Sequence, residues 1–218
     1  MTAPLAPAGT IVYRGHDALY LNVTNRCSCA CRFCLREWTD GVYGESLVLE
    51  REPEAHEVTV AVELAFADGP ASEVVFCGFG EPTMRLDVVL AVTEWLHLRR
   101  IRARLDTNGH GGLVNPDVDV PAALAAAGLG AVTVSLNAAD PETYDDVCRP
   151  VFAKTHRAVI QFAEQCVHHD METTLTAVDY AGADLAGCEA IAAALGAGFR
   201  VRGLAAPREP APATKGET

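Results

Sequence analysis

Residues 24–36 read Thr-Asn-Arg-Cys-Ser-Cys-Ala-Cys-Arg-Phe-Cys-Leu-Arg, and no other stretch of the chain says as much about its fold and chemistry. Cys27, Cys31 and Cys34 follow a C-x3-C-x2-C spacing, and an aromatic residue, Phe33, precedes the third cysteine. Three thiolates in one short loop can hold three irons of a cubane [4Fe-4S] cluster. The fourth iron then has no protein ligand, so it is free to bind a second molecule.

Other uses of the same cysteines fit the sequence less well. A structural zinc site needs four Cys or His ligands in paired spacings, and no second C-x2-C or H-x3-H pair lies at the usual distance. Disulfides would require an oxidising compartment, but residues 1–7 lack the charged and apolar regions of an export signal. Cys29 lies off the spacing, and we interpret it as a bystander or an alternative ligand.

The composition predicts a protein of the reducing cytoplasm with one hydrophobic core. The chain has 218 residues, 50% of them hydrophobic, a formal net charge of −12 and eight cysteines. No apolar run approaches the roughly 20 residues that span a bilayer. The acidic balance argues against nucleic acid or an anionic membrane as partners, because binding to phosphates depends on dense Lys and Arg.

Short apolar runs rich in β-branched residues alternate with segments of helical period along the chain. Strands are expected at 18–23, 73–77, 102–106, 131–136, 172–178 and 199–204. Helices are expected at 53–67, 84–99, 120–127, 153–168 and 184–195. Such alternation predicts an α/β fold with parallel strands and right-handed crossovers. Six strands are too few for a closed eight-stranded barrel, so we expect an open (β/α)6 partial TIM barrel with a lateral mouth.

This periodic region sets the expected domain boundaries. Residues 18–204 form the barrel domain, 1–17 an N-terminal extension and 205–218 a flexible C-terminal tail, since both ends are rich in Pro, Ala and polar residues.

Three further motifs follow expected strands, where an α/β fold binds ligands. The first is Gly78-Phe79-Gly80-Glu81-Pro82, and the second is Asp106-Thr107-Asn108-Gly109. In the third, Ser135 and Asn137 share one strand face because side chains alternate with a period of two. Each motif alone also suits an ordinary turn at the end of a strand.

The four motifs together resemble the radical S-adenosylmethionine (SAM) superfamily. This resemblance implies one [4Fe-4S] cluster on Cys27, Cys31 and Cys34, with SAM on the open iron. It also implies reductive cleavage of SAM to methionine and a 5'-deoxyadenosyl radical, with an electron donor such as flavodoxin or ferredoxin. The SAM contacts that it implies are Phe33 near the adenine, the ammonium site at Gly78, Gly80 and Glu81, and polar contacts from Asp106, Thr107, Asn108, Ser135 and Asn137.

Two finer resemblances point in different directions. The run Asp106 to Gly109 is similar to one in glycyl-radical-enzyme activases, where the acid and the threonine seat SAM's carboxylate through a monovalent cation. The motif set as a whole looks most like the TatD-associated radical SAM proteins, which suggests a TatD-like hydrolase as a partner. Three hypotheses follow: an enzyme acting on an unidentified substrate, an activase acting on a partner protein, and a noncatalytic iron-sulfur or SAM-binding regulator.

Overall fold

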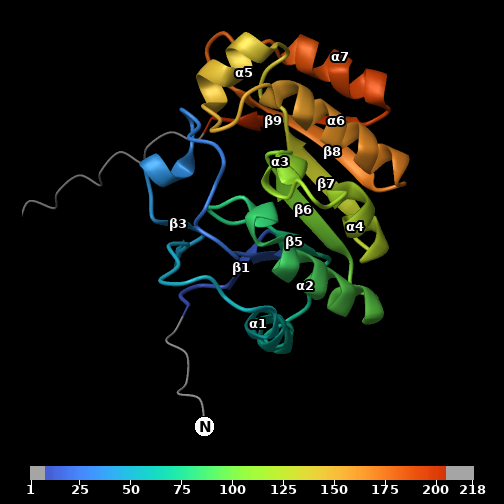
Figure 1. The fold of residues 1–218 in the computed structure, drawn as a ribbon. Coiled ribbons are helices and arrows are strands. Elements are labelled where there is room, and N and C mark those ends of the chain that lie inside the picture. Colours follow the sequence, from blue (N-terminus) through green and yellow to red (C-terminus); the bar gives the residue numbers. More distant parts are fainter. Residues whose placement is uncertain (1–7, 205–218) are drawn as a thin grey trace, which may run out of the picture.

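Seven strands form one sheet in the order β1-β2-β5-β6-β7-β8-β9 in the computed structural model, which describes residues 8–204 (Figure 1). The strands are β1 Val12–Gly15, β2 Ala18–Leu21, β5 Val74–Phe76, β6 Ala103–Thr107, β7 Ala131–Ser135, β8 Glu172–Asp179 and β9 Gly198–Gly203. The strands from β2 to β9 pair in parallel, whereas β1 pairs antiparallel with β2. The expected six parallel strands are therefore confirmed. Among the described residues β1 and β9 do not pair, so the barrel stays open.

Five helices follow successive parallel strands and pack on one face of the sheet (Figure 1). They are α1 Ala55–Ala67, α2 Leu86–Leu98, α4 Val120–Ala126, α6 Thr155–His168 and α7 Leu185–Leu195. Leu105 of β6 and Phe76 of β5 are fully buried with Val89 of α2 and Val159 of α6 in the same core. Burial of this apolar layer supplies most of the favourable free energy of folding.

The other face of the sheet points into the open barrel and is largely polar. The strand register aligns Arg104 with Val75 and Asp106 with Thr133, and Thr176 with Arg200. Since paired residues of neighbouring strands point to the same side, this inner face carries the even-numbered side chains of β6 and β9. A polar lumen inside an apolar outer layer suits the binding of a polar ligand.

The N-terminal boundary predicted from the sequence is wrong in one respect. Residues 12–15, assigned to an extension outside the domain, form β1 and belong to the sheet. Tyr13 of β1 stacks on Tyr20 of β2 at a centroid distance of 5.2 Å and donates a hydrogen bond to the Cys77 carbonyl at 2.9 Å. A four-residue strand is too short for its alternation to stand out in the sequence. The tail predicted at 205–218 lies outside the described residues.

Several short elements were not expected from periodicity. They are the strands β3 Gly41–Val42 and β4 Glu45–Ser46, the helices α3 Gly111–Val114 and α5 Pro141–Cys148, and the 3-10 turns at Leu35–Glu37 and Pro82–Arg85. The helix α5 begins with Pro141 after Asp140, whose side chain accepts the Thr143 N–H at 2.9 Å. Its local start signal is clear, but its eight residues hold few apolar positions. No helix among the described residues is long and apolar enough to cross a membrane.

Candidate functional site

The cysteine loop, residues 22–34, leaves β2 and lies against the segment that follows α5. Cys29 forms an isolated antiparallel bridge with Pro150. The Ala30 N–H donates to the Cys148 carbonyl at 3.1 Å and the Arg32 N–H to the Val147 carbonyl at 2.9 Å. These contacts give backbone N–H groups of the loop the hydrogen-bond partners that regular secondary structure does not supply there.

The loop forms one wall of a cavity of about 230 Å³ at the carboxyl ends of the parallel strands. Eight of the residues predicted from the sequence line it, namely Cys27, Phe33, Cys31, Cys34, Gly78, Asn108, Ser135 and Asn137. The cavity is also lined by residues that sequence reasoning did not assign to the site, above all Tyr144, Cys148 and Arg202. Since one cavity receives both the loop after β2 and the end of β9, the sheet must curve to bring its two edges together.

A chain of buried polar side chains, which we call the inner network, holds the middle of the cysteine loop. The Asn108 amide donates to Ser28 Oγ at 2.9 Å and lies 3.8 Å from Cys27 Sγ and 3.7 Å from Cys29 Sγ. Ser28 Oγ lies 2.8 Å from His110 Nδ1, and His110 Nε2 lies 2.9 Å from the Tyr144 hydroxyl. Ser28, His110 and Tyr144 are fully buried, so each of these contacts satisfies groups that have no access to water.

Burial lowers the pKa of His110 to about 4, against an ordinary value of 6.5. The imidazole is therefore neutral near pH 7, with one nitrogen that donates and one that accepts. His110 directly follows the Asp106–Gly109 motif in the sequence, and in the structure it is an interior link between the cysteine loop and α5. Its position depends on packing between distant segments, and no local pattern marks it.

Glu81 braces the loops after β5 and β6 instead of lining the cavity. Its Oε1 accepts from the Thr83 N–H at 3.1 Å and from the Thr83 and Thr107 hydroxyls at 2.7 Å, and its Oε2 accepts from the Asn108 N–H at 2.7 Å. Burial raises the pKa of this carboxyl, while the four hydrogen bonds act in the opposite direction. Glu81 and Thr107, both predicted to contact SAM, are thus occupied in fixing the position of Asn108.

The two predicted glycines permit a close approach of the loop after β5 to the start of the cysteine loop. A Cβ on Gly80 would lie 2.3 Å from the Thr24 carbonyl oxygen, and one on Gly78 would lie 2.2 Å from Asn22 Oδ1. Both distances exclude a side chain. The sequence predicted that glycine here admits a ligand. What the glycines meet among the described residues is the root of the cysteine loop, although Gly78 also lines the cavity.

Asp106 lies deeper in the lumen than the cavity. Its carboxylate accepts a hydrogen bond from Arg104, and the same Arg104 donates to Glu73 Oε1 at 3.0 Å and to Thr133 Oγ1 at 3.2 Å. Neither Asp106 nor Thr107 is among the residues that line the cavity. The ion pair with Arg104 occupies the carboxylate that the resemblance assigned to a monovalent cation.

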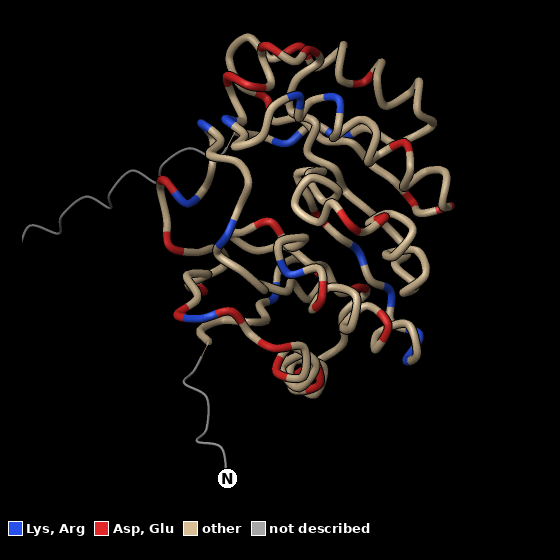
Figure 2. The backbone as a smooth tube through the Cα atoms, in the orientation of Figure 1, with Lys and Arg blue, Asp and Glu red and all other residues tan. Residues whose placement is uncertain are grey.

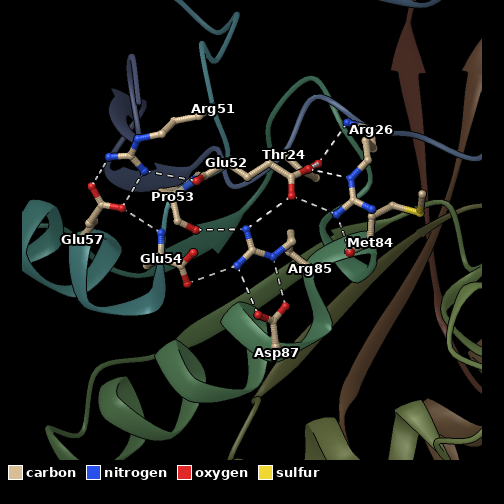
Figure 3. Close-up of polar contacts among 10 residues, drawn as sticks. All are labelled: Thr24, Arg26, Arg51, Glu52, Pro53, Glu54, Glu57, Met84, Arg85 and Asp87. Atoms are coloured by element: carbon tan, nitrogen blue, oxygen red, sulfur yellow. Dashed lines mark hydrogen bonds and ion pairs between the residues drawn. The ribbon is translucent and has the colours of Figure 1, made fainter. Parts of the chain in front are cut away.

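A second set of contacts, which we call the outer network, holds the root of the cysteine loop at the surface (Figure 3). Arg26 makes a bidentate contact with Glu52, with distances of 2.6 and 2.9 Å, and the Thr24 hydroxyl donates to the same carboxylate. Arg85 donates to the Pro53 carbonyl at 3.1 Å and pairs with Asp87 at 3.1 Å. These contacts join the loop to the start of α2 and to the segment that precedes α1.

The far side of the cavity is formed by the ends of β7 and β8. Ser135 and Asn137 both line it, although Asn137 lies beyond the end of β7 and does not share a strand face with Ser135, and the Asn137 amide lies 3.6 Å from Cys148 Sγ. Asn137 adopts a left-handed backbone conformation with φ of 60°, which asparagine tolerates better than most residues. Phe33 stacks on Tyr180 at a centroid distance of 5.8 Å, so the aromatic residue before Cys34 has a protein partner in this structure.

The donor set fits a polynuclear cluster. Cys27, Cys31 and Cys34 are free thiols, each partly exposed, and all three line one cavity. Within residues 8–204 no three His, Cys, Asp or Glu side chains are arranged to hold a single metal ion. Cys29 lines the same cavity, which leaves it open as a bystander or an alternative ligand.

Comparison with solved structures gives the same fold. The chain is similar to SuiB of Streptococcus suis bound to its precursor peptide SuiA, with a TM-score of 0.67 and 15% identity over 87% of this chain and 39% of that one. A radical SAM methyltransferase from Sphaerobacter thermophilus gives a TM-score of 0.57 and 17% identity over 88% and 68% of the two chains. The protein anSMEcpe with bound AdoMet gives 0.61 and 15% over 86% and 51%.

The chain spans about two fifths of SuiB, so the activity of that larger protein does not transfer to it. No curated protein sequence matches the chain. The family model for the radical SAM superfamily, in contrast, matches residues 21–183, which is more than half of the chain and includes the cysteine loop and the strand ends that form the cavity, except that of β9. This chain belongs to the radical SAM superfamily, and its open α/β sheet is the partial barrel of that superfamily.

Proposed function

We propose that this protein is an enzyme that binds one [4Fe-4S] cluster through Cys27, Cys31 and Cys34, binds SAM in the same cavity, and removes hydrogen from an unidentified substrate. The observation that carries this proposal is the lining of one cavity by the three spaced thiols together with Gly78, Ser135 and Asn137. When bound, the cluster supplies the electron that splits SAM into methionine and a 5'-deoxyadenosyl radical.

The residues of the chain have three tasks in this proposal. The Gly78 backbone and the Ser135 and Asn137 side chains offer hydrogen bonds to the polar methionine and ribose groups of SAM. Phe33, packed on Tyr180, offers an aromatic surface beside the adenine. The curved sheet shields the reacting atoms from water, which would otherwise compete for the radical.

Asn108 has a further role, because its amide lies near the sulfur atoms of Cys27 and Cys29. Hydrogen bonds to cluster sulfurs are one means by which a protein sets a cluster's reduction potential. Glu81 and Thr107 then act as positioning residues, since they hold the backbone of Asn108.

Anaerobic reconstitution with iron and sulfide tests the cluster assignment. The wild type should acquire one cluster with its visible charge-transfer absorbance, and Cys27→Ala, Cys31→Ala and Cys34→Ala should each abolish it. Cys188→Ala is the matched control, because Cys188 is buried in α7 away from the cavity. Cys29→Ala should retain the cluster. Loss of iron in Cys29→Ala with retention in Cys27→Ala would show that the ligand set is wrong.

The reaction itself is tested with dithionite or a flavodoxin system as electron source. The reconstituted wild type should release 5'-deoxyadenosine slowly without substrate, and the triple cysteine variant should release none. A wild type that holds its cluster and SAM but releases no 5'-deoxyadenosine with any reductant would favour the noncatalytic regulator. The electron donor and a TatD-like partner stay predictions from the resemblance, and no contact among the described residues favours the activase hypothesis over a small-molecule substrate.

A further inference from the structure

Two arginines, Arg200 and Arg202, point from the last strand, β9, into the open barrel. In the register of the sheet Arg200 aligns with Thr176 and Arg202 with Val178 of β8. Val178 and Arg202 line the cavity of the cysteine loop, and Arg200 lines a deeper space of the lumen with Glu73 and Arg104. β9 is an edge strand, so Arg202 lies at the lateral opening, where a molecule from solvent would enter.

Arg202 lacks the side-chain partners that Arg104, another arginine of the lumen, has. Arg104 pairs with Glu73 and Asp106. The side chain of Arg202 has no hydrogen bond or ion pair with any residue that the structure describes, although its backbone belongs to the ladder between β8 and β9. Arg36, on the opposite wall of the cavity, donates to the Asn25 carbonyl at 2.9 Å but makes no ion pair within residues 8–204. No Asp or Glu from the described part of the chain lines this cavity.

This local excess of positive charge contrasts with the rest of the molecule. The chain has a formal net charge of −12, and acidic residues gather on α1 and α5 (Figure 2). The composition of the chain therefore does not explain why Arg36 and Arg202 line a cavity that no carboxylate lines. Guanidinium groups bind carboxylate and phosphate groups through paired, charge-assisted hydrogen bonds.

We propose that the substrate carries a carboxylate or phosphate group and that Arg202 binds this group at the open side of the barrel. This inference rests on the proposed function, because it assigns the substrate class of the same cavity. The anionic group would anchor the substrate at β9 and direct the rest of the molecule toward Ser135 and the cysteine loop.

SAM also has a carboxylate, and the strand order separates the two assignments. Ser135 and Asn137, the polar groups offered to SAM, follow β7, and β8 lies between β7 and β9. Neighbouring strands are about 4.8 Å apart, so Arg202 lies on a strand about 10 Å from that of Ser135. A SAM molecule held at Gly78 and Ser135 leaves the guanidinium of Arg202 for a second ligand.

Anaerobic titration calorimetry tests this assignment on protein that carries its cluster and SAM, with inorganic phosphate and acetate as probes. The wild type should bind at least one of the two anions, and the anion that it prefers identifies the substrate's acidic group. Arg202→Gln should weaken this binding by about tenfold or more, as expected for the loss of a charge-assisted contact. Arg200→Gln is the matched control on the same face of the same strand and should change the affinity less than about twofold. The SAM affinity of Arg202→Gln should equal that of the wild type.

Three results would overturn the assignment. The first is a wild type that binds neither anion. The second is an Arg202→Gln variant that binds the anions as well as the wild type does. The third is a loss of SAM affinity in Arg202→Gln as large as the loss of anion affinity, which would assign Arg202 to SAM's own carboxylate. Failure of the proposed function is distinct from all three, since a protein that binds phosphate through Arg202 but releases no 5'-deoxyadenosine keeps the anion site and loses the SAM chemistry.

Discussion

The root and the middle of the cysteine loop lie a few residues apart and are held by opposite kinds of chemistry. The outer network (Figure 3) secures Arg26 with an ion pair to Glu52 and Thr24 with a hydrogen bond to the same carboxylate. The side chains of Arg26 and Glu52 are 53% and 28% exposed. The inner network secures Ser28 with uncharged groups, the fully buried His110 and the half-buried Asn108. Solvent screens the first set and does not reach the second.

This difference suggests a division of tasks. An exposed ion pair contributes little free energy and can break and re-form without consequence for the core. A buried polar group without its partner carries the whole cost of desolvation, so a buried network tolerates only one arrangement. The part of the loop that carries the cysteines is thus attached where the geometry is fixed, and its root is attached where the geometry can vary.

The largest expected effect comes from removing the brace behind the inner network. Glu81→Ala leaves four donors without their acceptor, and the free energy of unfolding should fall by about 3–5 kcal/mol. Glu81→Gln keeps the shape of the side chain but turns one acceptor into a donor, so it should cost about 1–3 kcal/mol. Urea unfolding of the cluster-free protein under reducing conditions measures both. If Glu81→Ala lowers the free energy of unfolding by less than about 1 kcal/mol, the middle of the cysteine loop is not held more rigidly than its root.

The next effect is a pH dependence that arises from His110 in the inner network. The pKa of His110 is lowered to about 4 by burial, so the folded state binds this proton more weakly than the unfolded state. Stability from the neutral imidazole is therefore complete above pH 6.5 and is lost as the pH falls toward 4. The loss should reach about 3 kcal/mol, because one pKa unit corresponds to about 1.4 kcal/mol.

Urea unfolding of the cluster-free protein between pH 7 and pH 4 checks this value. His110→Gln should flatten the pH dependence in that interval. Tyr144→Phe removes the hydrogen bond to His110 Nε2 but leaves the titratable imidazole of His110 in place. The variant should therefore have a lower free energy of unfolding and the same pH dependence as the wild type. If the free energy of unfolding changes with pH equally in the wild type and in His110→Gln, the assignment of this dependence to His110 is wrong.

The smallest effect should come from the outer network. A double-mutant cycle of Arg26→Gln and Glu52→Gln should give a coupling free energy of about 0.5–1 kcal/mol, near the upper end for exposed pairs because the contact is bidentate. This coupling should fall as sodium chloride is raised from about 0.05 to 0.5 M, since salt screens exposed charges. A coupling free energy above about 2 kcal/mol that salt does not change would contradict the proposed difference between the root and the middle of the loop.

The sequence by itself determined the fold class and predicts the position of the proposed cluster site. The spacing of Cys27, Cys31 and Cys34 is local, so it needs no tertiary information, and the alternation of strand and helix periods fixes the parallel sheet through the handedness of its crossovers. The meeting of Ser135 and Asn137 with the cysteines also followed, because the carboxyl ends of parallel strands face one edge of the sheet.

The tertiary structure alone decided which polar residues face the cavity. Glu81, Asp106 and Thr107 lie in motifs that suggest ligand contacts, yet packing turns Glu81 and Thr107 toward each other and pairs Asp106 with Arg104. His110 and Arg202 join the site from segments with no distinguishing pattern, and β1 extends the sheet with only four residues. The physical reason is the same in each case: a side chain's partners are set by contacts between distant segments, and these depend on the curvature of the whole sheet, which no local spacing encodes.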